Sequence, residues 1–317
     1  MKTHLDIFFG LTLSLMISAC QPASSSPGMA PESKGNPAVS AAVANPLIDL
    51  TVPAAQEPQT DSKVFDESVI FSPNFAINQN DPSLSDLFSS KGVSNLCFPT
   101  ALAEDLVYLA AYHSPKFSAL QLHGLSGNLI NPNSVVRQLT TLCRTDFNKG
   151  TDSLDAINCS LEILKQSGYD TGATQLISPF NQSATLPITS REVTIKDIRE
   201  ALKTGNPIIL EIAWFKFDST TNQWVHDNGH YFTVFGYDYN TSWGEDQIQV
   251  KVVNPEMNYN TARKYALFDT VTIQRYSPQP GITYPAHRPF ILSGNGFSGA
   301  TDRGFLGMLL TVAPANR

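Results

Sequence analysis

Three side chains of this 317-residue chain have the types and the chain order of a thiol hydrolase site: Cys97, His230 and Asn254. The thiolate is the reacting form of cysteine, so a base must lie beside it and a third group must hold the ring of that base. Cys97 precedes a helical pattern, and a helix N-terminus favours an anion. Its unsatisfied N–H groups can also bind an oxyanion. The sequence therefore predicts a nucleophile, a base and an orienting group, in that order.

Two predicted strands must position the base and the orienting group. His230 follows Asp227-Asn228-Gly229, a turn signature, and begins an apolar strand over residues 231–237. Asn254 closes the next strand, which alternates over residues 247–253. Because antiparallel neighbours place these two ends side by side, we expect Asn254 to accept a hydrogen bond from His230.

The nucleophile must stand at the start of a helix. Apolar residues recur at helical spacing over residues 100–113, and Pro99 suits the first turn. Residues 194–197 have the spacing of a capping box, and residues 277–303, rich in Pro and Gly, predict a long loop. Other helices are expected over residues 134–143, 153–166 and 195–205, and other strands over 207–217, 265–275 and 305–312. Helices followed by antiparallel strands predict an α+β fold.

The chain has four cysteines, and Cys97 is the one to which no structural role is assigned. Cys143 and Cys159 lie on consecutive predicted helices and can form a disulfide, which export would permit and which would be worth about 3 kcal/mol in the loop-entropy model. Cys20 ends an apolar leader and is assigned to lipid. Cys97 is then left over, and an unpaired cysteine of an exported protein is flagged as reactive. The alternatives are that the first two are buried thiols and that Cys97 is a small buried hydrophobe.

The leader, residues 1–20, has the features of an export signal. A basic residue precedes an apolar run over residues 7–17, which is too short to span a bilayer. The residues that end it, Ser18-Ala19-Cys20, resemble the lipobox of bacterial lipoproteins. The resemblance implies that the thiol of Cys20 carries a diacylglycerol, and Gln21 after it implies the outer membrane of the bacterial cell envelope. The alternative is an ordinary cleaved signal peptide.

Residues 21–64 consist mainly of Pro, Ala, Ser, Gln and Asn, a composition that predicts a disordered tether. Residues 65–317 suit one domain. The formal net charge is −7 without a basic cluster, so nucleic-acid binding has no support. His226 and His230 have no carboxylate or cysteine at metal-ligand spacing nearby, so we expect no metal and no cofactor.

Four segments carry a resemblance to a known family: NLCFPTALA around Cys97, LKTGNPIILEI around Lys203, GHYFTVFGYD around His230 and VKVVNP around Asn254. They resemble papain-like cysteine peptidases of the bacteriocin-processing (double-glycine peptidase) type over residues 95–255. The resemblance implies a papain-like fold, with a helical N-terminal half packed on a C-terminal antiparallel sheet. It also implies a Cys97 nucleophile, a His230 base, an Asn254 orienting group and a peptide or protein substrate.

The chain departs from the family pattern in three ways. Phe98 replaces the glycine after the nucleophile, and Asn254 stands where this subfamily usually has Asp, although papain itself uses Asn. Papain-like enzymes carry an oxyanion-binding Gln about six residues before the cysteine, where this chain has Lys91. Asn95 or Ser94 could substitute, and Asn95 is our prediction for the oxyanion donor.

These observations predict a membrane-anchored cysteine peptidase that hydrolyses peptide or isopeptide bonds. Two other functions use the same features. A transglutaminase-like acyl transferase needs the same three residue types, and a non-catalytic papain-like module that binds peptide or cell-wall material would fit Lys91 in place of Gln. The sequence leaves the oligomeric state open.

Overall fold

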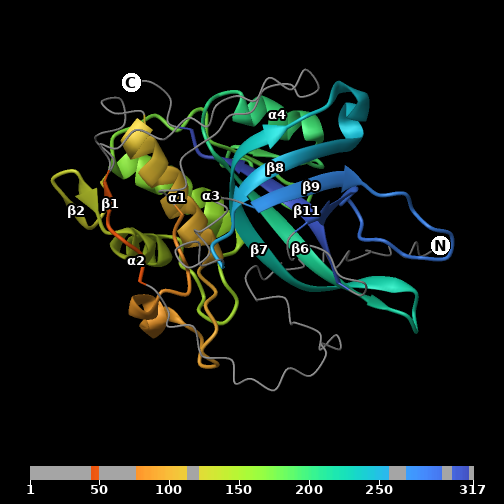
Figure 1. Cartoon of the computed structure of the whole chain (residues 1–317), viewed down its shortest axis with the longest axis horizontal. Coiled ribbons are helices and arrows are strands. Elements are labelled where there is room, and N and C mark those ends of the chain that lie inside the picture. Colours follow the sequence, from red (N-terminus) through yellow and green to blue (C-terminus); the bar gives the residue numbers. More distant parts are fainter. Residues whose placement is uncertain (1–43, 50–75, 113–120, 257–268, 295–301, 314–317) are drawn as a thin grey trace, which may run out of the picture.

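The computed structural model describes residues 44–49, 76–112, 121–256, 269–294 and 302–313. Helices pack against a large, mostly antiparallel sheet (Figure 1), so the predicted α+β class is confirmed. No helix within these residues is both long and apolar enough to cross a membrane. The leader and its Cys20 lie outside the described residues.

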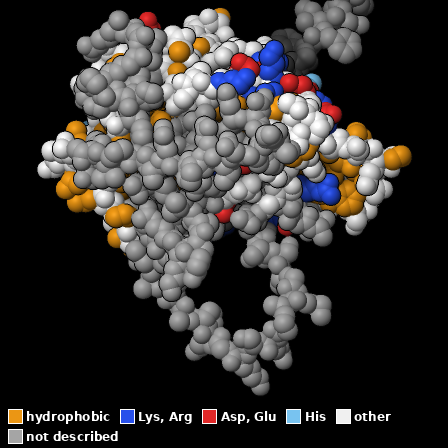
Figure 2. Space-filling model, turned by 45° about the horizontal axis from the view of Figure 1, so that its top comes forward, with side chains coloured by type: hydrophobic (Ala, Val, Ile, Leu, Met, Phe, Trp, Pro, Cys, Tyr) orange, Lys and Arg blue, Asp and Glu red, His pale blue; other side chains and the backbone are white. Residues whose placement is uncertain are grey.

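On the face shown in Figure 2, the basic side chains of the described residues are accompanied by acidic ones.

Four α-helices occur within the described residues, and their starts follow from local sequence. The predicted capping box is present, because Thr194 and Asp197 exchange side-chain and backbone hydrogen bonds. The first helix begins at Cys97, three residues before the predicted start. The helical elements are η2 (Pro82–Leu87), α1 (Cys97–Tyr112), α2 (Pro132–Leu142), α3 (Ser153–Gln166), α4 (Ile195–Leu202) and the 3-10 segment η3 (Thr241–Asp246).

The strands form two sheets, and the larger one closes on itself. The small sheet contains β1 (Ile48–Asp49), β2 (Leu125–Ser126) and β3 (Leu129–Ile130). The large sheet contains β4 (Gln175–Ile177), β5 (Ile188–Thr189), β6 (Ile208–Asp218), β7 (Gln223–Asp238), β8 (Gln247–Val253), β9 (Asp269–Arg275), β10 (Phe290–Ser293) and β11 (Asp302–Thr311). Because β10 pairs with both β9 and β11, the strands from β6 to β11 form a closed barrel.

Two predictions about the strands were wrong. The segment 277–303, predicted as a loop, contains β10 and the beginning of β11. Its Pro and Gly residues flank a short apolar run, and the barrel closure pairs that run on both sides. Asp227-Asn228-Gly229 is no turn, because it lies inside β7, which continues to pair with β6 for several residues before His230. The hairpin turn lies at Asn222, whose φ is +54°, a conformation that Asn tolerates well.

Apolar side chains of β7 alternate between two cores. Tyr231 and Phe235 belong to the core beneath the helices α1, α2 and α3. Phe232 and Val234 belong to the barrel interior, which α4 also covers. The helical layer and the barrel are therefore joined through one strand, and this strand carries His230.

Residues 44–49 fall within the range predicted as a disordered tether, and that part of the prediction was wrong. Ile48 pairs with Ile130 in the small sheet and is 4% exposed. The side-chain amide of Asn45 donates to the carbonyl oxygen of Asn78 at 3.0 Å, and the N–H of Asn78 returns a bond of 2.8 Å. These contacts attach the segment to the domain.

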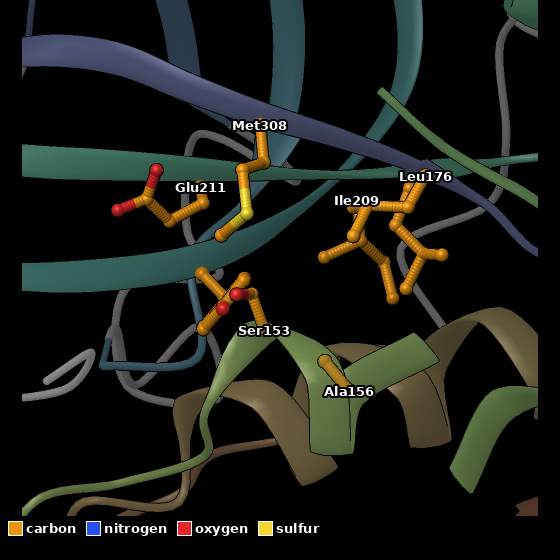
Figure 3. A pocket seen from close by; sticks show the side chains of 8 residues that line it. Ser153, Ala156, Leu176, Ile209, Glu211 and Met308 are labelled. Atoms are coloured by element: carbon orange, nitrogen blue, oxygen red, sulfur yellow. The ribbon is translucent and has the colours of Figure 1, made fainter. Parts of the chain in front are cut away.

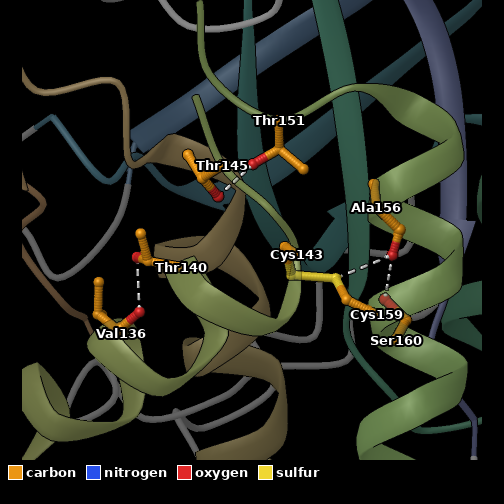
Figure 4. The surroundings of a disulfide bond; sticks show 8 residues. All are labelled: Val136, Thr140, Cys143, Thr145, Thr151, Ala156, Cys159 and Ser160. Atoms are coloured by element: carbon orange, nitrogen blue, oxygen red, sulfur yellow. Dashed lines mark hydrogen bonds between the residues drawn. A yellow bond between two sulfur atoms is a disulfide. The ribbon is translucent and has the colours of Figure 1, made fainter. Parts of the chain in front are cut away.

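The predicted disulfide between Cys143 and Cys159 is confirmed. It joins the residue that caps the end of α2 to the second turn of α3, with the two Cα atoms 4.9 Å apart (Figure 4). Both cysteines are buried in the core of the helical layer. The bond therefore holds two helices of this layer together at one point.

Candidate active site

His230, in the middle of β7, is in direct contact with Asn254, the residue that follows the end of the neighbouring strand β8. His230 pairs with Ile212 across β6 and β7, and only 3% of it is exposed. Asn254 follows the last residue of β8, where Pro255 prevents the ladder from continuing. Nε2 of His230 lies 2.8 Å from Oδ1 of Asn254. The predicted contact is thus present, although His230 lies inside β7 and not at the start of a strand.

The surrounding hydrogen bonds assign the protons of the imidazole ring. Oδ1 of Asn254 also accepts from the backbone N–H of Glu256 at 3.0 Å, which identifies this atom as the amide oxygen. An amide oxygen only accepts, so Nε2 of His230 must be the donor. In neutral His230 the lone pair then lies on Nδ1, which has no hydrogen-bond partner within the described residues. The carboxylate of Glu256 lies 4.0 Å from Nδ1.

Cys97 is the first residue of α1 and is fully buried. The prediction that it is the unpaired cysteine was wrong for this structure, because Cys97 is disulfide-bonded. The prediction depended on assigning Cys20 to lipid, and Cys20 lies outside the described residues. Cys97 can act as a nucleophile only after this disulfide is reduced.

Two sets of contacts bring the start of α1 next to the histidine and asparagine. The ring of Phe98 packs edge-on against the ring of Tyr231, with centroids 5.0 Å apart. These are the residues directly after Cys97 and His230. On the other side, the backbone N–H of Gln79 donates to the carbonyl oxygen of Pro255 at 2.8 Å.

Gln79 also contacts the segment before Cys97. The hydroxyl of Ser94 donates to the carbonyl oxygen of Gln79 at 2.9 Å, and the side-chain amide of Gln79 donates back to Ser94 at 3.4 Å. The end of β8, Gln79 and the start of α1 are therefore consecutive neighbours. Sequence reasoning missed Gln79, which stands 18 residues before Cys97, because it looked for a Gln close to the cysteine. The helix η2 and its flanks occupy the intervening chain.

The residues considered for the oxyanion position differ in exposure and in hydrogen bonding. Lys91 is exposed. The side-chain amide of Asn95 donates to the carbonyl oxygen of Phe147 at 2.7 Å, so one of its two N–H donors is used. Gln79 is 2% exposed, and its Oε1 has no hydrogen-bond partner within the described residues. Oδ1 of Asn95 likewise has no hydrogen-bond partner among these residues, so the two amides differ mainly in the bond that each donates, which is 3.4 Å for Gln79 and 2.7 Å for Asn95.

A small cavity lies beside the site, between the N-terminal turn of α3 and the sheet (Figure 3). Its volume of about 10 Å³ is that of roughly one water molecule. Glu211 and Tyr231 line it, and neither Oε1 of Glu211 nor the hydroxyl of Tyr231 has a hydrogen-bond partner within the described residues. Arg288 forms a buried ion pair with Glu211 at 3.3 Å. Burial raises the pKa of Glu211, while the charge of Arg288 opposes the shift.

The fold and the site place this chain in the class of α+β proteins with a papain-like arrangement, in which helices pack on a sheet that carries a His–Asn pair. The model of the Peptidase_C39 like family matches residues 75–278, more than half of the chain. The chain therefore belongs to this family of C39-like cysteine peptidases, and the predicted family resemblance is confirmed at that level. No similar protein was found among those with curated functions.

Proposed function

We propose that this chain is a cysteine peptidase that hydrolyses peptide or isopeptide bonds with Cys97, in its reduced form, as the nucleophile. His230 is the base and Asn254 holds its ring. The hydrogen bond between Nε2 of His230 and Asn254 carries the proposal, because it leaves Nδ1 as the acceptor for a thiol proton. Membership in a family of cysteine peptidases supports it independently.

The proposed reaction has two halves. The Sγ–H proton of Cys97 passes to Nδ1 of His230, and the thiolate attacks the carbonyl carbon. The tetrahedral intermediate collapses as His230 gives this proton to the leaving amine, which leaves a thioester on Cys97. Water then attacks the thioester and gives a proton to His230, and the carboxylic acid is released as Sγ regains a proton from the ring.

For the oxyanion we propose Gln79, together with the N–H groups at the start of α1. The side chain of Gln79 lies beside Ser94, three residues before Cys97, and its bond of 3.4 Å to Ser94 is long for an N–H···O contact. A weakly held amide can turn towards a developing charge at small cost. Asn95 stays a second candidate, because its bond to Phe147, at 2.7 Å, is shorter than the bond from Gln79 to Ser94.

A second function is favoured by the disulfide at Cys97. If the thiol is permanently oxidised, the chain has the shell of a peptidase without its nucleophile, and it would bind peptide or cell-wall material without cleaving it. The two functions differ in the state of one sulfur atom. Reduction therefore distinguishes them.

We also propose that Cys20 carries lipid and anchors the domain in the bacterial cell envelope, at the outer membrane. Because Cys143 and Cys159 pair with each other, lipid on Cys20 and a disulfide at Cys97 exclude each other within one chain, and this proposal goes with the reduced form of Cys97. The proposal rests on the leader pattern alone. Mass spectrometry of membrane-extracted protein tests it, because a mature chain that begins elsewhere, or an unmodified Cys20, would exclude the anchor. Cys20→Ala should move the protein out of the membrane fraction.

The experiment that tests the catalytic proposal uses the full chain with and without a phosphine reductant. Peptide and isopeptide libraries are incubated with wild type, Cys97→Ala and His230→Ala. We expect cleavage by reduced wild type, none by Cys97→Ala and almost none by His230→Ala. Cys143→Ala serves as a control for a cysteine outside the site. If reduced wild type cleaves nothing and binds the same peptides as Cys97→Ala, the non-catalytic function replaces this one.

A further inference from the structure

Glu104 is a fully buried acid on α1 that contacts two other segments of the candidate site. Its Oε1 accepts a hydrogen bond from the backbone N–H of Ile77 at 2.9 Å, and its Oε2 lies 2.6 Å from Oγ1 of Thr233. Ile77 stands two residues before Gln79, and Thr233 stands three residues after His230. One side chain thus joins the segments that carry the proposed oxyanion donor and base.

The same side chain is fixed relative to the nucleophile. Glu104 follows Cys97 by seven residues on one helix, which is about two turns. A helix is stiff over this distance, so any shift of Glu104 relative to β7 moves Cys97 with it. Thr233 also contacts the backbone of α1 directly, because its Oγ1 lies 3.1 Å from the carbonyl oxygen of Ala101.

The hydrogen atoms around Thr233 favour the neutral form of Glu104. A threonine hydroxyl has one hydrogen, and the carbonyl of Ala101 can only accept it. If the hydroxyl donates to Ala101, Oε2 of Glu104 must carry a proton and donate to Oγ1. Ile77 then donates to Oε1, and the chain of bonds is complete without a charge. Burial raises the pKa of Glu104 well above its usual range, and the neighbouring Asp105 raises it further.

We propose that Glu104 is a positioning residue, whose protonated side chain holds together the three segments that carry the oxyanion donor, the nucleophile and the base. This inference rests on the proposed function. Glu104 touches no reacting atom in the scheme above. It acts through the placement of the helix start relative to the strand.

The physical reason is the burial of its partners. Ile77 is fully buried, so its N–H group has no access to water if the acceptor is removed. The segment of residues 76–79 would then move to satisfy this group, and Gln79 would move with it. A misplacement of about 1 Å can cost about 10²-fold in rate. Binding of substrate need not change.

Two substitutions at Glu104 separate the hydrogen bonds from the shape of the side chain. In Glu104→Gln, the amide oxygen can accept from Ile77 and the amide nitrogen can donate to Thr233, so both bonds persist. Glu104→Met has similar length and no strong hydrogen-bonding group. The full chain is reduced, and three quantities are measured: kcat and KM for a cleaved peptide, the pH profile of Cys97 alkylation by mass spectrometry, and hydrogen exchange of the Ile77 amide.

We expect Glu104→Gln to keep kcat within about threefold of wild type and to keep the alkylation profile. Glu104→Met should lower kcat by about 10²-fold with little change in KM. It should also shift the alkylation profile to higher pH and speed exchange at Ile77. If Glu104 only filled space, Glu104→Gln and Glu104→Met would have similar kcat values. A kcat that is kept in Glu104→Gln and lost in Glu104→Met therefore indicates a role for the hydrogen bonds.

A second pair of variants covers the case in which Glu104→Met fails to fold. Thr233→Ser keeps the hydroxyl, and Thr233→Val has the same shape without it. We expect Thr233→Ser to have the kcat and the alkylation profile of wild type. Thr233→Val should lower kcat and shift the alkylation profile in the same direction as Glu104→Met.

Two results would overturn the inference. One is a Met or Val variant with the kcat, alkylation profile and Ile77 exchange of wild type. The other is a Gln variant as impaired as Met, which would mean that Glu104 acts as an anion. Failure of the proposed function has a different signature, because wild type would then cleave nothing and His230→Ala would not change Cys97 alkylation. Exchange at Ile77 would still report whether Glu104 holds the segments together.

Discussion

The rings of Phe98 and Tyr231 meet edge to face, with an interplanar angle of 71° and centroids 5.0 Å apart. Each ring belongs to the residue directly after a proposed catalytic side chain. Phe98 is also the position at which the chain departs from the Cys-Gly-Pro pattern of the family it resembles. The aromatic ring therefore fills space between the start of α1 and β7 that a glycine would leave empty, and it fixes the distance between the two elements.

Replacing Phe98 by Ala should lower both stability and turnover. Truncation of a fully buried Phe costs about 3–5 kcal/mol of unfolding free energy, and the cavity would let the helix start shift relative to His230. Urea unfolding and peptide cleavage measure the two effects. The matched control is Phe235→Ala, since Phe235 makes an edge contact with Tyr108 further along the same helix and strand. If both variants lose the same stability and the same kcat, the contact at Phe98 has no special role in the site.

Asn254 offers a test of the hydrogen bond to His230. Asn254→Ala should reduce kcat by about 10²-fold or more, because the imidazole then adopts the wrong tautomer or pose, as in other hydrolases. Asn254→Asp should keep most activity, because a carboxylate also accepts from Nε2 of His230. Nitrogen-15 chemical shifts of the ring report the tautomer directly. Activity of the Ala variant equal to wild type would remove Asn254 from the site.

The backbone of β11 passes very close to the buried ion pair between Glu211 and Arg288. A Cβ atom at Gly307 would lie 1.4 Å from Oε2 of Glu211 and 2.2 Å from Nη1 of Arg288. Gly307→Ala must therefore displace a buried charge pair, and breaking such a pair costs about 3–5 kcal/mol. We expect a drop of that size in unfolding free energy. Gly281→Ala is the control for a glycine with open space around it, although its φ of +78° predicts a smaller loss from backbone strain.

Asp105 should make the stability of the domain depend on pH. It is fully buried, its carboxylate oxygens have no hydrogen-bond partner within the described residues, and burial raises its pKa well above the usual range. A carboxyl with a raised folded-state pKa contributes stability below its unfolded pKa of about 3.9 and loses it as the pH rises towards the folded value. Asp105→Asn should therefore gain stability relative to wild type as the pH rises above about 4 towards the folded-state pKa of Asp105, by up to about 1.4 kcal/mol per pH unit.

The measurement for Asp105 is urea unfolding at several pH values. Asp170→Asn, at an exposed position, serves as the control for the substitution itself. A constant difference between Asp105→Asn and wild type across this range would mean that Asp105 does not change its protonation on unfolding. Glu104→Gln should show the same direction of change, because burial raises the pKa of Glu104 as well.

Features encoded locally could be predicted from the sequence. The strand 247–253 and the helix 153–166 have the predicted bounds, because each has a clear period and clear ends. The contact between His230 and Asn254 was predicted from antiparallel pairing of neighbouring strands, although His230 lies inside β7 and not at its start. The disulfide followed from the placement of two cysteines on consecutive helices.

Features that depend on long-range pairing could not be predicted. The short strand β10 is stabilised by neighbours on both sides, so its own sequence, between Pro and Gly residues, gives little signal. Gln79 reaches the site only because η2 lies between it and Cys97. Residues 44–49 are ordered by hydrogen bonds of Asn45 to Asn78, more than thirty residues away. The state of Cys97 depends on a pairing that no local pattern specifies.

Removing the disulfide between α2 and α3 should weaken the helical layer without altering the site. The bond closes a loop of 16 residues, for which the chain-entropy model gives about 3 kcal/mol. We expect the Cys143→Ala, Cys159→Ala double variant to lose about this much unfolding free energy under non-reducing conditions. Under reducing conditions it should match reduced wild type, because the entropic restraint is then absent from both. The two cysteines belong to α2 and α3, whereas His230 lies on β7 and Asn254 follows β8. Alkylation of reduced Cys97 should therefore keep its pH profile in the double variant. A changed profile would show that the disulfide also positions α1, and the candidate site would then extend into the helical layer.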